Sequence, residues 1–130
     1  MSIRPKVSIG MPVRNGQRFI RQAIDSLLAQ TFTNFELIIC DNASTDSTEA
    51  ICREYASRDS RVRYFRNSRN LGPAGNHNKC VDLSQGDYFR WHAHDDMCAP
   101  DYLEKCVECL DHNPDVVIAY PRTLIVDEEG

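Results

Sequence analysis

Residues 36–40 read Glu-Leu-Ile-Ile-Cys, and residues 41–46 directly after them read Asp-Asn-Ala-Ser-Thr-Asp. These eleven residues are the strongest indication of the fold class. A short, nearly all-apolar run is typical of a strand buried on both faces, as in a parallel sheet. The polar run that follows is turn-prone, and its side-chain oxygens can cap a helix that we expect over Ser47–Ser57.

The same alternation of strand and helix continues on both sides of this stretch. The clearest helical segment is Gln17–Gln30, where apolar residues recur at the i, i+3, i+4 and i+7 spacing of one helix face. The other predicted helices are Pro73–Leu83 and Pro100–Asn113, and the other predicted strands are Lys6–Met11, Val62–Arg66, Asp87–His92, Val116–Tyr120 and Thr123–Val126. Single helices between strands build parallel βαβ units. The expected fold class is therefore α/β, an open, mostly parallel Rossmann-like sheet with helices on both faces.

Length, charge and hydropathy exclude several classes of protein. The chain has 130 residues, which suits a single domain over residues 1–130. Its 15 Lys and Arg against 19 Asp and Glu give a net charge of −4, which argues against a nucleic-acid-binding protein. No apolar stretch reaches the roughly 18 residues of a membrane span, and Met1–Pro5 lack signal-peptide character. We therefore expect no membrane span in this chain and a cytoplasmic location.

The six cysteines are scattered and mostly lie in apolar patterns. A disulfide framework is typical of short secreted chains, so we interpret the cysteines as reduced thiols that act as small buried residues. The alternative is a zinc-stabilised interaction domain. Its ligands would come from His92, His94, Cys98, Cys106 and Cys109, although Cys106 and Cys109 lie within one helical pattern without a second Cys-x-x-Cys.

Ligands of open α/β sheets bind outside the carboxyl ends of the strands. In this chain those positions are residues 12–16, 41–44, 70–72 and 94–96, which we expect to converge on one rim. The first predicted strand is not followed by a glycine-rich phosphate-binding loop, which argues against a Rossmann dehydrogenase and a P-loop enzyme. A bound diphosphate would then depend on a cation to neutralise its charge.

Three aspartates on this rim are the strongest chemical signal. Asp95 and Asp96 are adjacent like charges, which a hard divalent cation such as Mg²⁺ would neutralise. A solvated turn or a helix N-cap is the structural alternative for this pair. Asp41 follows four apolar residues, and its carboxylate only accepts hydrogen bonds, which suits the imide N–H of uracil or thymine. Capping of the following helix is the alternative for Asp41.

Four stretches, taken in order, resemble the nucleotide-binding half of glycosyltransferase family 2, whose members have the GT-A fold. They are Val7–Asn15 (VSIGMPVRN), Ile39–Thr48 (ICDNASTDST), Asn70–Asn78 (NLGPAGNHN) and His94–Leu103 (HDDMCAPDYL). Together, at the family's spacing, they make a specific match over nearly the whole chain. The resemblance implies a GT-A type of α/β fold, with this chain as the amino-terminal, nucleotide-sugar-binding part of a longer enzyme.

The resemblance also implies roles for individual residues. Pro12, Val13 and Asn15 would line the base and ribose, Asp41 would bond the base imide, Asn42 and Ser44 would shape the same loop, and Asn70, Gly72, His77 and His94 would lie near the nucleotide. Asp95 and Asp96 would be the metal-binding end of the family's D-x-D motif. These two aspartates would serve catalysis by holding Mg²⁺ or Mn²⁺ at the leaving group.

The chain departs from the family pattern at three points. The first D-x-D aspartate falls at Ala93, which cannot bind a ligand, and His94 beside it can partly replace it. The family's frequent arginine in the third stretch falls at His77, whose charge would depend on pH. The family's general base lies further along, in the acceptor half, and the acids at 127–129 come too early to supply it.

The implied reaction is metal-dependent transfer of a sugar, with inversion, from a nucleoside diphosphate sugar to an acceptor hydroxyl. UDP-sugar is the expected donor. The acceptor would be a saccharide or lipid-linked saccharide, as in cell-surface polysaccharide biosynthesis at the inner face of the membrane. Without the general base, these 130 residues would turn over little donor. A non-catalytic nucleotide-sugar binding module is the alternative, favoured by Ala93.

Two aromatic residues, Tyr88 and Trp91, come just before the aspartate pair. Aromatic rings can stack on sugars. Both residues lie on a predicted strand, however, where aromatic side chains more often fill the core. We therefore expect both side chains in the core.

Overall fold

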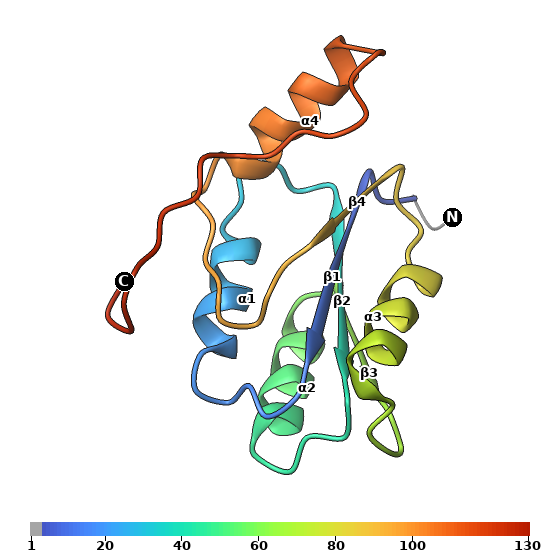
Figure 1. Ribbon diagram of the computed structural model, residues 1–130, viewed down its shortest axis with the longest axis vertical. Helices are drawn as coiled ribbons and strands as arrows, with labels where there is room; N and C mark the ends of the chain where they lie inside the picture. The colour runs from blue at the N-terminus through green and yellow to red at the C-terminus, as the bar shows by residue number, and fades with distance from the viewer. Residues whose placement is uncertain (1–3) are drawn as a thin grey trace.

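The computed structural model describes residues 4–130, so the expectation for Met1–Ile3 lies outside the described residues. Strands and helices alternate along this part of the chain (Figure 1). They are β1 (Val7–Val13), α1 (Ile20–Leu28), β2 (Phe35–Asp41), α2 (Thr48–Arg58), β3 (Val62–Arg66), α3 (Gly72–Asp82), β4 (Tyr88–Trp91) and α4 (Tyr102–His112). The predicted order is confirmed as far as α4, with boundaries that differ by a few residues at most.

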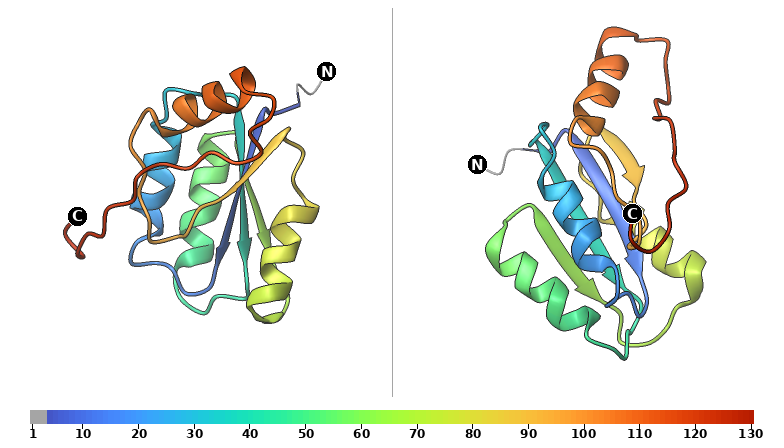
Figure 2. Two further views of the ribbon diagram at one scale, coloured as in Figure 1. Left: turned by 45° about the horizontal axis from the view of Figure 1, so that its top comes forward. Right: turned by 90° about the vertical axis from the view of Figure 1, so that its left-hand side faces the viewer.

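The strands form one parallel sheet in the order β3-β2-β1-β4. β1 pairs with β2 along its whole length, from Val7 opposite Phe35 to Val13 opposite Asp41. α1 and α2 lie on one face of the sheet and α3 on the other (Figures 1 and 2). The predicted fold class is confirmed. Because all the strands are parallel, their carboxyl ends lie at one edge of the sheet.

The main core lies between the sheet and the helices α1 and α2. Every residue of β2 is buried, which accounts for its apolar run. The largest fully buried apolar side chains are Ile9, Met11, Ile20, Ile24, Leu27, Leu37, Ile38, Ile39 and Leu103. On the opposite face, Cys80 of α3 packs against Ile38 and Cys40 of β2.

The cysteines of the described chain are free thiols. Cys40, Cys52 and Cys80 are buried, as the interpretation of small buried residues requires, whereas Cys109 is exposed. Burial is the main reason why the pKa of the Cys52 thiol is raised to about 12. Cys52 is therefore protonated at neutral pH and behaves as an apolar residue.

One buried acid interrupts the apolar run of β2. The Glu36 carboxylate accepts hydrogen bonds from Ser8 Oγ at 2.6 Å and from the Gln85 amide at 2.8 Å, and Arg63 forms an ion pair with it. A buried charge is costly unless it is paired and hydrogen-bonded, and here both conditions are met. Glu36 thereby ties β1, β3 and the segment before β4 together near the amino ends of the strands.

The prediction of two strands after α4 is wrong. Residues 115–126 have no regular secondary structure. Their apolar side chains lie in solvent, with Val117 93% and Ile125 100% exposed. A strand needs hydrogen-bonding partners along its edge, and within residues 4–130 no strand pairs with this segment. High β-propensity alone therefore did not produce a strand.

Substitutions in β1 and in the carboxyl-terminal segment should have opposite consequences for stability. For Ile9→Ala we expect the free energy of unfolding to fall by about 2–5 kcal/mol, because the change leaves a cavity in the core. For Val117→Ala we expect a change within about 0.5 kcal/mol, because this side chain contacts mainly water. Urea denaturation followed by circular dichroism measures both. A large loss in Val117→Ala would contradict the exposed position of residues 115–126.

Candidate functional site

A cavity of about 460 Å³ opens at the carboxyl edge of the sheet. It lies among the loops after β1, β2, β3 and β4 and the beginning of α3. The lining residues are Pro12, Val13, Arg14, Asn42, Asn70, Pro73, Asn76, His77, Trp91, His92, Ala93, His94 and Asp95. The four strand ends that the sequence placed on one rim therefore do converge there.

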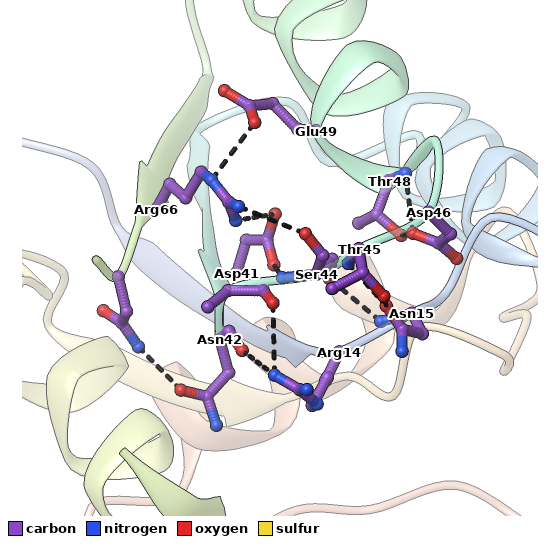
Figure 3. A network of polar contacts seen from close by, with 12 residues as sticks. Arg14, Asn15, Asp41, Asn42, Ser44, Thr45, Asp46, Thr48, Glu49 and Arg66 are labelled. Carbon is purple, nitrogen blue, oxygen red and sulfur yellow. Dashed lines mark hydrogen bonds and ion pairs between the residues drawn. The ribbon is translucent and has the colours of Figure 1, made fainter. Parts of the chain in front are cut away.

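The loops after β1 and β2 interlock through reciprocal hydrogen bonds (Figure 3). The Asn15 amide donates to Ser44 Oγ at 2.9 Å, and the Thr45 amide donates to Asn15 Oδ1 at 2.8 Å. The Gly16 amide donates to Thr48 Oγ1 at 2.9 Å. Asn15 and Ser44 are thus structural partners of each other, and neither lines the cavity.

The start of α2 is held by Asp46. Its carboxylate accepts hydrogen bonds from the Thr48 amide and hydroxyl, at 2.9 and 2.6 Å, and from the Gln17 amide at 3.1 Å. Burial on its own would raise the pKa of Asp46, but the bonds from Thr48 and Gln17 outweigh it and keep the pKa below its ordinary value. The predicted capping role of the 41–46 run therefore falls to Asp46.

Two non-glycine residues in these loops have left-handed backbone conformations, Asn15 with φ of 53° and Ala43 with φ of 57°. Asparagine adopts this region fairly readily, whereas alanine has no side-chain group to compensate for the strain. Such strain costs on the order of 1 kcal/mol and persists only where surrounding contacts impose it. The interlocking bonds around Asn15 and Ser44 supply those contacts.

Four asparagines connect the β2 and β3 loops to α3. Asn42 Nδ2 donates to Asn70 Oδ1 at 2.7 Å, and Asn67 Nδ2 donates to both Asn42 Oδ1 and Asn76 Oδ1, at 3.1 and 2.9 Å. Lys79 Nζ donates to Asn67 Oδ1 at 2.7 Å. This network fixes the wall of the cavity from which Asn42, Asn70 and Asn76 project.

The loop after β3 makes a sharp turn into α3 at Gly72. Gly72 has φ of +76°, a conformation that side chains disfavour, and its amide donates to Asn70 Oδ1 at 2.9 Å. Its carbonyl accepts a 3.3 Å bond from Asn42 Nδ2. Gly72 therefore shapes the loop that carries Asn70 without lining the cavity itself.

Asp41 lies outside the lining of the cavity. Its carboxylate is 0% exposed and accepts hydrogen bonds from the Ser44 amide at 2.9 Å and from the Tyr64 hydroxyl at 2.6 Å. Arg66 lies 3.7 Å from Oδ2. Burial, followed by the bond to Asp41, raises the pKa of Tyr64, so the hydroxyl keeps its proton and donates it. Asp41 thus holds the β2 loop in shape, and its expected bond to a base imide stays a prediction.

His92 positions the loop that carries the aspartate pair. The ring is 3% exposed, and burial, followed by the positive charge of Arg90, lowers its pKa to about 4. The neutral ring lies between two polar groups. Its Nδ1 is 3.0 Å from Arg90 Nη2, and its Nε2 is 3.0 Å from the carbonyl oxygen of Asp96. Because the guanidinium can only donate, Nδ1 accepts and Nε2–H donates to Asp96.

Asp95 lines the cavity, and Asp96 lies beside it in the same loop but outside the lining. Both residues are exposed. Throughout residues 4–130, neither carboxylate takes part in an ion pair. Mg²⁺ is commonly held by one or two carboxylates, with its other ligands supplied by water and phosphate oxygens. The pair therefore fits a cation that arrives with a phosphorylated ligand.

The zinc site of the alternative interpretation does not form. In the part of the chain that the structure describes, no group of three or more His, Cys, Asp or Glu side chains could hold a metal ion. His92 is engaged with Arg90 and Asp96, and Cys98 accepts a 3.2 Å hydrogen bond from Gln30 Nε2. Two of the five candidate ligands are thus engaged in separate local contacts.

Two further histidines reach the cavity. His94 packs across to the β1 loop, where a Cβ on Gly16 would lie 2.8 Å from His94 Cδ2, so glycine permits the close approach. Nδ1 of His77 lies 2.8 Å from the Pro73 carbonyl oxygen, and the centroid of its ring lies 4.9 Å from the ring centroid of Trp91. The expectation that Trp91 belongs to the core is wrong, because it is 44% exposed and lines the cavity, whereas Tyr88 packs against the core.

The predicted site residues divide into two groups. Those that line the cavity are Pro12, Val13, Asn42, Asn70, His77, His94 and Asp95, and those that lie outside the lining are Asn15, Asp41, Ser44, Gly72 and Asp96. Among the other lining residues, the sequence placed Arg14 on the rim without giving it a role, and it gave no site role to Pro73, Asn76, Trp91 or His92. The position of Arg14 between Val13 and Asn15 could have indicated it. Trp91 could have been found from its place at the end of a strand that leads into the aspartates.

Comparisons with known proteins agree with the motifs and the fold. A model of the family described as Glycosyl transferase family 2 matches residues 8–130. EpsE of Bacillus subtilis is 37% identical over 131 aligned residues, which cover 100% of this chain and 47% of EpsE. The glycosyltransferase MJ1057 of Methanocaldococcus jannaschii is 31% identical over 129 residues, which cover 98% of this chain and 44% of MJ1057. The chain thus spans less than half the length of these relatives.

Solved structures share the fold. TarS residues 1–349 of S. aureus superpose with a TM-score of 0.77 at 24% identity, covering 82% of this chain and 32% of TarS. The mannosyltransferase PcManGT from Pyrobaculum calidifontis has a TM-score of 0.74 at 24% identity, covering 84% of this chain and 33% of PcManGT. With its four motifs, its parallel sheet and a family model that matches nearly its whole length, the chain belongs to glycosyltransferase family 2.

Proposed function

We propose that this chain forms the donor site of a glycosyltransferase that transfers a sugar from a nucleoside diphosphate sugar to an acceptor hydroxyl. UDP-sugar is the proposed donor, Mg²⁺ or Mn²⁺ the proposed cofactor and inversion the proposed stereochemical course. The observation that carries the proposal is the cavity at the carboxyl edge of the sheet, with the unpaired carboxylate of Asp95 in its wall. Family membership supports the reaction class.

The proposed roles of the residues follow from their contacts. Asn42 and Asn70 form a fixed wall for the nucleoside, because the asparagine network leaves them little freedom to move. Asp95 would be a cation ligand, helped by Asp96, and His92 would hold their loop in place through the Asp96 carbonyl. When bound, Mg²⁺ or Mn²⁺ would act as a Lewis acid that stabilises the negative charge developing on the departing diphosphate.

The acceptor hydroxyl must lose its proton to a general base during transfer. We propose that this base is an acidic residue outside the 130 residues, as the family pattern implies, since Asp95 is the only acid in the cavity lining and is assigned to the cation. The acceptor, proposed as a saccharide or lipid-linked saccharide, would then be bound partly by another segment of a longer protein. None of the helices in residues 4–130 is long and apolar enough to cross a membrane.

Proteins of the same fold give support for the donor and the cation. TarS has been solved with UDP and with UDP-GlcNAc. PcManGT has been solved with GDP-Man and Mn²⁺. These complexes are consistent with a nucleoside diphosphate sugar and a divalent cation in the cavity of this chain.

A non-catalytic nucleotide-sugar binding module is the second candidate function. Ala93 favours it, because this residue lines the cavity where the family pattern has the first aspartate of its D-x-D motif. Release of UDP from a UDP-sugar by a longer protein that contains this chain would decide for the enzyme. Binding of the donor without release or transfer would decide for the module.

Removing the proposed cation ligand should abolish the effect of the metal on nucleotide binding. For Asp95→Ala we expect the Kd of UDP in the presence of Mn²⁺ to rise about 10-fold or more, equivalent to about 1.4 kcal/mol or more. Isothermal titration calorimetry measures it. Asp115→Ala, which removes an exposed acid outside the cavity, is the matched control and should bind like the unaltered protein. Unchanged affinity in Asp95→Ala would remove Asp95 from the site.

Restoring an acid at position 93 should strengthen the same binding. For Ala93→Asp we expect the Mn²⁺-dependent affinity for UDP to rise about 3–10-fold, because an added carboxylate next to the cation contributes a further oxygen ligand. Ala93→Asn introduces a side chain of nearly the same size as aspartate but without its charge, and it should give a smaller gain in affinity for UDP. Weaker binding of UDP to Ala93→Asp with Mn²⁺ present would show that position 93 faces the phosphates rather than the cation.

A further inference from the structure

Arg90, on β4, contains a buried atom that lacks a partner. Of the buried side-chain nitrogen and oxygen atoms in residues 4–130, only its Nη1 forms no hydrogen bond. Arg90 also takes part in none of the ion pairs within those residues. A buried cationic group without an acid beside it lowers stability. In a folded protein, an unsatisfied buried group is one sign of a functional role.

The rest of the guanidinium joins the two ends of the segment that carries the aspartate pair, residues 93–101, which we call the aspartate loop. Just before this loop, Nη2 donates to Nδ1 of His92 at 3.0 Å. Just after it, the guanidinium carbon lies 4.2 Å from the ring centroid of Tyr102, the first residue of α4. This second contact is a cation–π interaction. Arg90 therefore closes the base of the aspartate loop.

The two halves of the aspartate loop are held by different parts of the molecule. The later half is bonded to the segment after α1, where Gln30 Nε2 donates to the carbonyl oxygen of Ala99 at 2.7 Å. The earlier half is held by His92, whose Nε2 lies 3.0 Å from the carbonyl oxygen of Asp96. The orientation of the His92 ring depends in turn on Arg90, which donates to its other nitrogen.

An arginine can make both of these contacts at once. The guanidinium is planar, so its face stacks on an aromatic ring while its N–H groups point outwards in the plane. Arg90 thus lies over Tyr102 and still donates to His92. Because a guanidinium only donates, Nδ1 of His92 must accept. The proton of the neutral ring is then on Nε2, the atom that reaches the aspartate loop.

We propose that Arg90 is a positioning residue for the aspartate pair. Acting through His92 and Tyr102, it holds the two ends of the aspartate loop together, so that the loop needs little further ordering when a cation binds. This inference rests on the proposed function, in which Asp95 and Asp96 bind Mg²⁺ or Mn²⁺. Hydrogen-bonded groups that orient metal ligands increase the affinity for the metal. The unpartnered Nη1 is then the cost in stability of a pre-organised site.

The test compares Arg90→Met with the unaltered protein by isothermal titration calorimetry, with the Kd of UDP measured once with Mn²⁺ and once with EDTA. Methionine fills much of the space of the arginine stem but has no charge and no N–H donor. We expect the Kd with Mn²⁺ to rise about 5-fold, below the roughly 10–100-fold typical of groups bonded directly to metal ligands, because Arg90 acts one contact further away. The Kd with EDTA should stay within about 2-fold.

Thermal unfolding distinguishes positioning from a general structural role. Arg90→Met removes a buried nitrogen without a partner, so the unfolding midpoint should stay unchanged or rise. Substitution of a residue that only supported the fold would lower the midpoint. Arg58→Met, which makes the same change at an exposed arginine of α2 outside the cavity, is the matched control. It should bind UDP like the unaltered protein, with and without Mn²⁺.

Arg90→Lys should recover part of the Mn²⁺-dependent affinity, because an ammonium group can still donate to His92. Equal losses of UDP affinity with Mn²⁺ and with EDTA would overturn the proposal, since Arg90 would then support nucleotide binding as a whole. A lower unfolding midpoint of Arg90→Met, or an unchanged Kd with Mn²⁺, would overturn it as well. If Mn²⁺ did not improve the binding of UDP to the unaltered protein, the proposed function itself would fail, and this inference with it.

Discussion

Complete burial of strand β2 governs how the loops at the carboxyl edge of the sheet can fold. β2 pairs with β1 on one side and β3 on the other, and each of its residues is buried. Polar groups at its carboxyl end must therefore find partners inside the protein. The Asp41 carboxylate finds them in Ser44, Tyr64 and Arg66. These bonds fold the next residues back over the strand end, and that loop then forms one wall of the cavity.

The acids at the carboxyl edge differ in function because they differ in burial. Asp41 has no exposure to solvent, so its charge is stabilised by protein groups and holds the loop. Asp95 is exposed and forms no ion pair in the described chain, so its charge is available to a cation. Arg66 is a structural charge among the cations, since Asp41 and Glu49 neutralise it. Partners within the protein, rather than residue type, separate structural charges from ligand-binding ones.

The β4 side of the cavity depends on a different device. β4 is an edge strand of the described sheet and contributes fewer buried side chains than β2. Its loop is instead fixed by the neutral ring of His92, which lies between Arg90 and the Asp96 carbonyl. Trp91 is exposed for the same reason, because an edge strand has less of the molecule packed on it. The aspartate pair is thus positioned by one buried histidine.

The amino-acid pattern alone predicts the parallel α/β fold, the order of its elements up to α4 and the rim where the loops meet. Periodic apolar residues report local structure and burial directly, and parallel strands bring their carboxyl ends to one edge. The same signals failed at residues 115–126, where an apolar run found no strand to pair with. The absence of Asp41 from the cavity lining, and the presence of Arg14 and Trp91 in it, depend on tertiary contacts. Those roles depend on partners such as Tyr64 and Arg66 for Asp41, and the Ala43 carbonyl for Arg14, which are contributed by other segments or by a strained backbone.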